Sequence, residues 1–163
     1  MRSSAHLACA RLAGLLLALF ALCLAIGPTL AASSQVNVIR VDGVISAGSA
    51  DYIVTAIKQA EKDKVAALVI ELNTPGGLDT SMRSIIMEML AAERPIVVYV
   101  APSGARAASA RAFITLAAHI AAMAPGTNMG AASPVAMGGQ MDKTMEKKVT
   151  NDAAAYMRTI AEK

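Results

Sequence analysis

Aromatic residues and cysteines are scarce in this sequence, and each shortage excludes a class of function. Aromatic residues make up 3% of the 163 residues, and tryptophan is missing altogether. Because proteins that bind nucleic acids use aromatic stacking and clustered basic residues, the composition argues against a nucleic-acid partner. The two cysteines, Cys9 and Cys23, both lie in an apolar N-terminal segment. The rest of the chain therefore contains no disulfide and no cysteine-based metal site.

Charged residues are also few, at 17% against 55% hydrophobic residues. The formal net charge is +3, and loss of Arg2 and Arg11 with the N-terminal segment would reduce it to about +1. That segment also contains His6, so His119 is the only histidine that would remain. We therefore expect no basic patch, no metal site and no cofactor.

The N-terminal segment has the pattern of a secretory signal. A positively charged start precedes an apolar run over residues 12–26, and Gly27-Pro28 ends that run shortly before small residues suited to cleavage. An uncleaved membrane anchor is the alternative, but the run is short for a bilayer crossing. We therefore predict a signal peptide at 1–32 and one domain at 33–163, located in the periplasm or another extracytoplasmic compartment, with association to the membrane.

The remaining sequence alternates between strand-like and helix-like patterns. Hydrophobic periodicity predicts strands at 36–41, 66–72, 95–100 and 119–124, and helices at 49–62, 78–93, 110–118 and 146–163. Ser49 is the expected N-cap of the first helix. The apolar run 66–72 is typical of a parallel strand covered on both faces. The pattern therefore predicts an α/β fold with a mainly parallel sheet flanked by helices, followed by a mobile loop at 132–143.

A single hydroxyl stands among alanines where the third strand feeds the next helix. This residue is Ser109, in the stretch Gly104-Ala105-Arg106-Ala107-Ala108-Ser109-Ala110. Its alanine neighbours leave the hydroxyl open, and the carboxyl edge of a parallel sheet is where α/β folds bind ligands. A small packing residue is the alternative interpretation. If Ser109 is a nucleophile, the amide of Ala110 points the same way as its hydroxyl.

A glycine turn follows the preceding strand at the same expected edge. In Pro75-Gly76-Gly77 the amides are free at the start of a helix, and glycine lets a carbonyl approach closely. Gly76 or Gly77 would then complete a two-donor oxyanion hole with Ala110. A turn that simply requires glycine is an equally good explanation of the turn taken alone.

A serine nucleophile also needs a base, and the sequence offers several. His119 lies one short helix beyond Ser109, but a structural histidine is the better interpretation. A lysine whose pKa is lowered by apolar surroundings can also accept the proton. The candidates are Lys143, Lys147 and Lys148, and spacing alone does not choose among them.

Three ordered motifs carry a resemblance to a known family. They are Leu72-Asn73-Thr74-Pro75-Gly76-Gly77, Pro102–Ala110 and Met123–Val135. Together they closely resemble the NfeD-type membrane-bound serine proteases, which share a fold group with signal peptide peptidase A and Clp protease. The resemblance covers residues 36–163, and its three motifs at consistent spacing make it specific. It implies a Clp protease/crotonase-like ββα-spiral.

The resemblance also implies a Ser–Lys dyad. Ser109 falls on the nucleophile position of the family. The segment Lys148-Val149-Thr150-Asn151 matches the segment that contains the family's base, so Lys148 is preferred over Lys147. The oxyanion-hole positions fall on Gly76, Gly77 and Ala110.

Two features depart from the family pattern. Arg111 stands where the family has glycine after Ser-Ala, and such a long cation could crowd the cleft or place a like charge near Lys148. Family members usually continue beyond the lysine helix, whereas this sequence stops at Lys163, so we expect a C-terminally incomplete protease domain.

The function that follows is an extracytoplasmic serine endopeptidase that cleaves apolar, membrane-proximal peptide or protein segments. By resemblance, a stomatin-like membrane protein is a possible substrate, and the apolar helix faces favour a homo-oligomer. Two alternatives keep the same fold. One is a catalytically inactive binding or scaffold module, because of Arg111 and the short C-terminus. The other is a crotonase-type acyl-CoA enzyme, against which the secretory signal argues.

Overall fold

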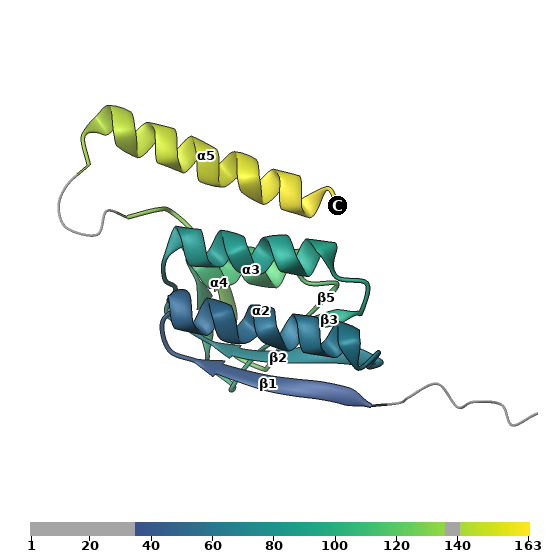
Figure 1. The fold of residues 1–163 in the computed structure, drawn as a ribbon. Helices are drawn as coiled ribbons and strands as arrows, with labels where there is room; N and C mark the ends of the chain where they lie inside the picture. The colour runs from purple at the N-terminus through teal and green to yellow at the C-terminus, as the bar shows by residue number, and fades with distance from the viewer. Residues whose placement is uncertain (1–34, 136–140) are drawn as a thin grey trace, which may run out of the picture. The chain divides into compact units, whose positions relative to one another are not determined.

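A four-stranded parallel sheet with helices gathered on one face forms the framework of the protein (Figure 1). The computed structural model describes residues 35–135 and 141–163, so the predicted signal segment and part of the predicted mobile loop lie outside it. The main sheet comprises β1 (Val36–Asp42), β2 (Ala67–Asn73), β3 (Ile96–Val100) and β5 (Ile120–Met123), in that order. The helices are α2 (Ala47–Lys62), α3 (Asp79–Ala91), α4 (Ala110–Ala117) and α5 (Lys143–Ala161).

The strand register confirms the predicted mainly parallel α/β fold. Val38 pairs with Val69, Val69 with Val97, and Val97 with Ile120, so one row of side chains crosses all four strands. The prediction that the sheet is covered on both faces is wrong. Val38 is 63% exposed and Ile120 is 55% exposed, because the helices within the described residues pack against the opposite face. Successive side chains of β2 alternate between buried and half-buried, so one face of the strand is buried and the other is half-buried.

The core lies between the sheet and the helix layer. Its fully buried side chains are mostly branched aliphatic residues, namely Ile53, Ile57, Leu68, Ile70, Leu72, Ile85, Ile86 and Ile114. Helix α5 runs along the outer side of α3 and α4 (Figure 1) and buries Ile160 in this core. At the end of α5, Lys163 Nζ donates to the carbonyl oxygens of Ala117 and Ala118.

Local capping and two short strands differ from the sequence prediction. The N-cap of α2 is Ser46, and Ser49 is the third helical residue of a capping box with it, so the assignment of Ser49 as N-cap is wrong. A second parallel pair, β4 (Arg106–Ala108) and β6 (Asn128–Gly130), was not predicted because each strand has only three residues. Within the ranges that the structure describes, none of the helices is both long and apolar enough to cross a bilayer.

Candidate active site

Ser109 occupies the bend between β4 and α4 with an unusual backbone conformation. Its φ is 55° and its ψ is −127°, a region that residues with a side chain rarely adopt. Its amide donates to the carbonyl oxygens of Gly130 (3.3 Å) and Ala131 (3.1 Å), which hold the bend in place. Backbone strain of about 1–3 kcal/mol persists only where surrounding structure imposes it, and it often marks functional sites. A serine on a strained strand-to-helix bend is also the geometry that exposes a nucleophilic hydroxyl.

The glycine turn meets Ser109 from the end of β2. Thr74 is buried, and its hydroxyl donates to the Gly76 carbonyl (3.0 Å) and accepts from the Gly76 amide (3.1 Å). This closes a tight turn in which Gly76 has a φ of 127°. The role of Thr74 was not predicted, although a threonine two residues before a glycine is a signal for such a turn.

The two glycines of the turn have different surroundings. A Cβ on Gly76 would lie 2.8 Å from Ser109 Cβ, so Gly76 is where the turn touches the serine. A Cβ on Gly77 would lie 2.1 Å from the carbonyl oxygen of Ile45, which also accepts from the Leu78 amide at 2.8 Å. Gly76 is therefore required for contact with Ser109, and Gly77 for contact with the chain after β1.

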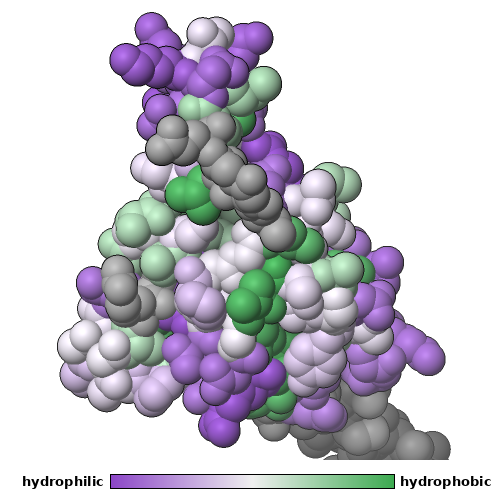
Figure 2. Space-filling view, turned by 90° about the vertical axis from the view of Figure 1, so that its left-hand side faces the viewer, coloured by the Kyte–Doolittle hydropathy of each residue, from purple (hydrophilic) through white to green (hydrophobic). Residues whose placement is uncertain are grey.

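These segments surround a cavity of about 230 Å³ at the carboxyl edge of the sheet. Figure 2 views this end of the protein and shows apolar side chains running between polar ones. The residues that line the cavity are mainly apolar: Gly77, Leu78, Asp79, Met82, Ser109, Ala110, Phe113, Ala132, Pro134, Val135 and Ala153. Within the described residues, no cluster of histidine and acidic side chains could hold a metal ion.

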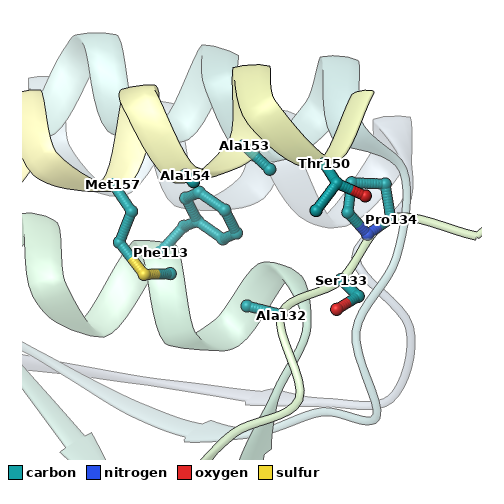
Figure 3. Close-up of a pocket in the computed structure, with 8 residues that line it drawn as sticks. All are labelled: Phe113, Ala132, Ser133, Pro134, Thr150, Ala153, Ala154 and Met157. Atoms are coloured by element: carbon teal, nitrogen blue, oxygen red, sulfur yellow. The ribbon is translucent and has the colours of Figure 1, made fainter. Parts of the chain in front are cut away.

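A second recess of about 200 Å³ adjoins this cavity between α4 and α5 (Figure 3). The two share Phe113, Ala132, Pro134 and Ala153, so they form a continuous apolar groove beside the serine. In Figure 3 the side chain of Phe113 points from α4 toward α5, and that of Met157 points from α5 toward α4. The groove suits an apolar side chain next to a carbonyl group placed at Ser109.

Two amides in the cavity lining are available to a ligand oxygen. Ala110 is the first residue of α4, so its amide has no acceptor within the helix. Gly77 is exposed, and its amide has no acceptor among the described residues. The Gly76 amide is instead bonded to Thr74, and Gly76 is buried outside the cavity lining. The arrangement therefore favours Gly77 and Ala110, rather than Gly76, as the pair of donors.

Lys148 does not reach the cavity in this structure. It is exposed on the second turn of α5, and it is not part of the cavity lining, which Ala153 of the same helix enters. The candidate base therefore does not line the cavity that Ser109 lines. Lys143 and Lys147 are exposed on α5 as well.

Arg83 attaches α5 to α3 next to the cavity. Its Nη2 lies 2.6 Å from Asp152 of α5, and its Nε lies 2.8 Å from Asp79, which lines the cavity. Its guanidinium also stacks 4.3 Å above the centre of the Tyr156 ring. The hydrogen bond to Asp79 and the nearby carboxylates raise the pKa of Arg83 despite its partial burial. These contacts set which side of α5 faces α3.

His119 belongs to the opposite edge of the sheet. Its Nδ1 accepts from the amide of Ile96, the first residue of β3, at 3.2 Å, and its own amide donates to the Ile96 carbonyl at 3.0 Å. Parallel strands begin at that edge, whereas Ser109 lies where they end. His119 is therefore a structural histidine, as the sequence analysis favoured.

Arg111 is buried outside the lining of the cavity. Its side chain is 0% exposed, its Nη2 donates to Asn73 Oδ1 at 3.1 Å, and it is not among the residues that line the Ser109 cavity. The expectation that this cation could crowd the cleft is therefore wrong. The side chain extends toward the end of β2 because Asn73 there offers an acceptor.

Comparison with known proteins gives a consistent set of relatives. The NfeD1b N-terminal domain family model matches residues 35–163. Membrane-bound protease PH1510 of Pyrococcus horikoshii is 37% identical over 150 residues, covering 91% of this chain and 34% of that protein. Membrane protein NfeD1b of Bacillus subtilis is 35% identical over 105 residues, covering 64% and 23%. This chain thus spans about a third or less of the length of these curated relatives.

Solved structures of the 1510-N membrane-bound stomatin-specific protease match the same fold. A serine-to-alanine mutant superposes with a TM-score of 0.72 at 35% identity, covering 80% of this chain and 64% of that chain. A lysine-to-alanine mutant in complex with a substrate peptide gives the same TM-score and identity, covering 80% and 61%.

Proposed function

Because the chain belongs to the NfeD1b N-terminal domain family, we propose that it is a serine endopeptidase with Ser109 as nucleophile and Lys148 as base. The observation that carries the proposal is the strained bend at Ser109, which opens into an apolar cavity together with two available amides. The relatives support it, since a protease domain of the same fold has been studied as a serine-to-alanine and a lysine-to-alanine mutant.

In the proposed reaction, Ser109 Oγ attacks the carbonyl carbon of a peptide bond. The neutral amine of Lys148 accepts the hydroxyl proton, and the amides of Gly77 and Ala110 donate to the oxyanion that forms. Lys148 then returns the proton to the leaving amine, which produces an acyl ester on Ser109. A water molecule, activated by the same amine, hydrolyses this ester and restores the hydroxyl.

The choice of Lys148 among the lysines of α5 rests on the segment Lys148-Val149-Thr150-Asn151, which matches the segment that contains the family's base. Ala153 is the α5 residue that lines the cavity at Ser109, and Lys148 is rotated by about 140° from it around the helix axis. Lys147 and Lys143 are rotated by about 120° and 80° from Ala153, so the helix face by itself does not choose among the three lysines. The first turns of α5 still have to move toward the cavity before the Lys148 amine reaches Ser109.

The proposed substrate is an apolar peptide segment, because apolar side chains line both the cavity and its adjoining recess. A stomatin-like membrane protein is the proposed partner, after the stomatin-specific relative. Membrane association, an extracytoplasmic location and a homo-oligomer belong to the same proposal. An inactive module is less well supported, since Arg111 lies outside the cavity lining.

The test measures cleavage of quenched fluorescent peptides with apolar segments by the full chain. Ser109→Ala should abolish turnover and labelling by a fluorophosphonate probe, because both require the hydroxyl. Lys148→Ala should lower kcat by roughly 100-fold or more. Lys147→Ala is the matched control, one residue away on another side of α5, and it should retain activity. Turnover that persists in both the Ser109 and Lys148 variants would exclude the dyad.

A further inference from the structure

Arg111 links two segments that meet at the proposed oxyanion hole. It directly follows Ala110 at the start of α4, and its Nη2 donates to Asn73 Oδ1 at 3.1 Å. Asn73 is the last residue of β2 and comes just before the glycine turn. Its Nδ2 donates in turn to Asp42 Oδ1 at 3.1 Å, and its carbonyl accepts from Gly43 at 2.9 Å. A chain of hydrogen bonds thus runs from the start of α4 to the ends of β2 and β1.

This buried cation does not serve stability well. Its Nε and Nη1 are buried without a partner among the described residues, and each unpaired donor has a desolvation cost. Burial lowers the pKa of Arg111, and only the nearby Asp42 carboxylate opposes that effect. Burying this cation therefore has a cost that the one hydrogen bond to Asn73 offsets only in part.

We propose that Arg111 is a positioning residue that sets the spacing between the two oxyanion donors, Ala110 and Gly77. This inference rests on the proposed protease function. The Ala110 amide begins the helix that carries Arg111, and the Gly77 amide lies four residues beyond Asn73. The Arg111–Asn73 hydrogen bond is a side-chain link between these two segments. Its loss would let the donors separate without removing either of them.

The expected kinetic signature is a lower kcat with little change in KM. An oxyanion hole acts on charge that develops in the transition state, so misplaced donors slow the chemical step more than they weaken substrate binding. Because Arg111 and Asn73 share the hydrogen bond between them, and Asn73 also donates to Asp42, losing both should cost about as much kcat as losing Asn73 alone. An independent structural role for each residue would instead give additive effects.

The experiment measures kcat and KM of the full chain for four variants. Arg111→Met and Asn73→Leu should each lower kcat by about 10- to 100-fold, with KM within about twofold of wild type. The double variant should resemble Asn73→Leu, and Arg111→Lys should recover part of the loss because it keeps one donor. Arg94→Met, which removes a cation from a peripheral pair with Glu61, is the control. An unchanged or higher kcat for Arg111→Met would overturn the inference.

Amide hydrogen exchange separates failure of this inference from failure of the proposed function. The probes are the Gly43 amide, which donates to Asn73, and the Gly76 amide, which donates to Thr74. If the wild-type chain shows no turnover that depends on Ser109, the protease proposal fails. Amide hydrogen exchange then tests by itself whether Arg111 links the two segments. Exchange at both amides should then be about tenfold faster in Arg111→Met than in the wild type. The increase should be smaller in Arg111→Lys, and Arg94→Met should show no change. Unchanged exchange in Arg111→Met would show that no link exists.

Discussion

Gly76 and Ser109 approach so closely that a Cβ on Gly76 would lie 2.8 Å from Ser109 Cβ and 3.1 Å from its Oγ. Real Cβ atoms essentially never come that near to another carbon, so the contact requires glycine. The turn after β2 and the bend before α4 therefore fit against each other at the hydroxyl.

Gly76→Ala should displace Ser109 and abolish its reactivity. The new methyl group would meet Ser109 Cβ, and a φ of 127° is itself unfavourable for alanine. We expect a loss of about 1–3 kcal/mol in the free energy of unfolding and no fluorophosphonate labelling. Denaturant titration and labelling measure the two effects. Gly104→Ala is the control, because Gly104 also has a positive φ but open space at its Cβ position. If Gly76→Ala labels like Gly104→Ala, the contact does not matter.

Gly77→Ala should prevent stable folding. Its Cβ would lie 2.1 Å from the carbonyl oxygen and 2.6 Å from the carbonyl carbon of Ile45, and these backbone atoms have little freedom to move. The Ile45 amide is itself bonded to the Gly76 carbonyl at 2.8 Å. We expect a loss of roughly 3 kcal/mol or more, measured by soluble yield and thermal unfolding. A Gly77→Ala protein as stable as wild type would contradict the described turn.

Arg83→Met should loosen α5 and reduce activity. Each exposed ion pair contributes roughly 0.2–1 kcal/mol, and the stacking on Tyr156 contributes about as much again. We expect faster amide exchange in α5 and a lower kcat. The wild type at high salt should approach the same behaviour, because salt screens these charges. Arg40→Met, which breaks the exposed pair with Glu71, is the control and should change neither. Unaltered exchange in α5 would mean that Arg83 does not hold this helix.

Alkaline pH should weaken the same helix through Tyr156. Burial raises the pKa of its hydroxyl above the ordinary value of about 10, against the opposing effect of Arg83. Above that pH the unfolded chain ionises before the folded one, so the free energy of unfolding should fall as pH rises through 10. Denaturant titrations at about pH 9 and 11 measure the change. Tyr156→Phe should reduce this pH dependence; an equal slope in the wild type and in Tyr156→Phe would refute the assignment.

Local patterns predicted most elements because strand and helix periodicities depend on neighbouring residues. The predicted helix at 78–93 is α3, and the predicted strand at 66–72 is β2, each within two residues at either end. The short strands β4 and β6 escaped prediction, since three residues are too few to show a period. The position of the described helices on one face of the sheet was also not predicted, because residues such as Val38 are apolar and yet exposed.

The candidate site shows the same division. Ser109 and the glycine turn were predicted from their residue types, and the structure brings them into contact. The separate environments of Gly76 and Gly77 were not predictable, because they depend on Thr74 and Ile45. The roles of Ser109 and Lys148 stay predictions until the variants are measured.

The amino-acid sequence by itself determined the order of strands and helices, the family, and which side chains and amides are available for chemistry. These properties are set by residue type and by spacing along the chain. The tertiary structure alone decided that Arg111 turns to Asn73, 38 residues away, that Gly77 rather than Gly76 opens to the cavity, and that Lys148 lies outside it. Each of these outcomes depends on contacts between segments that are far apart in the sequence, and local patterns contain no information about such contacts.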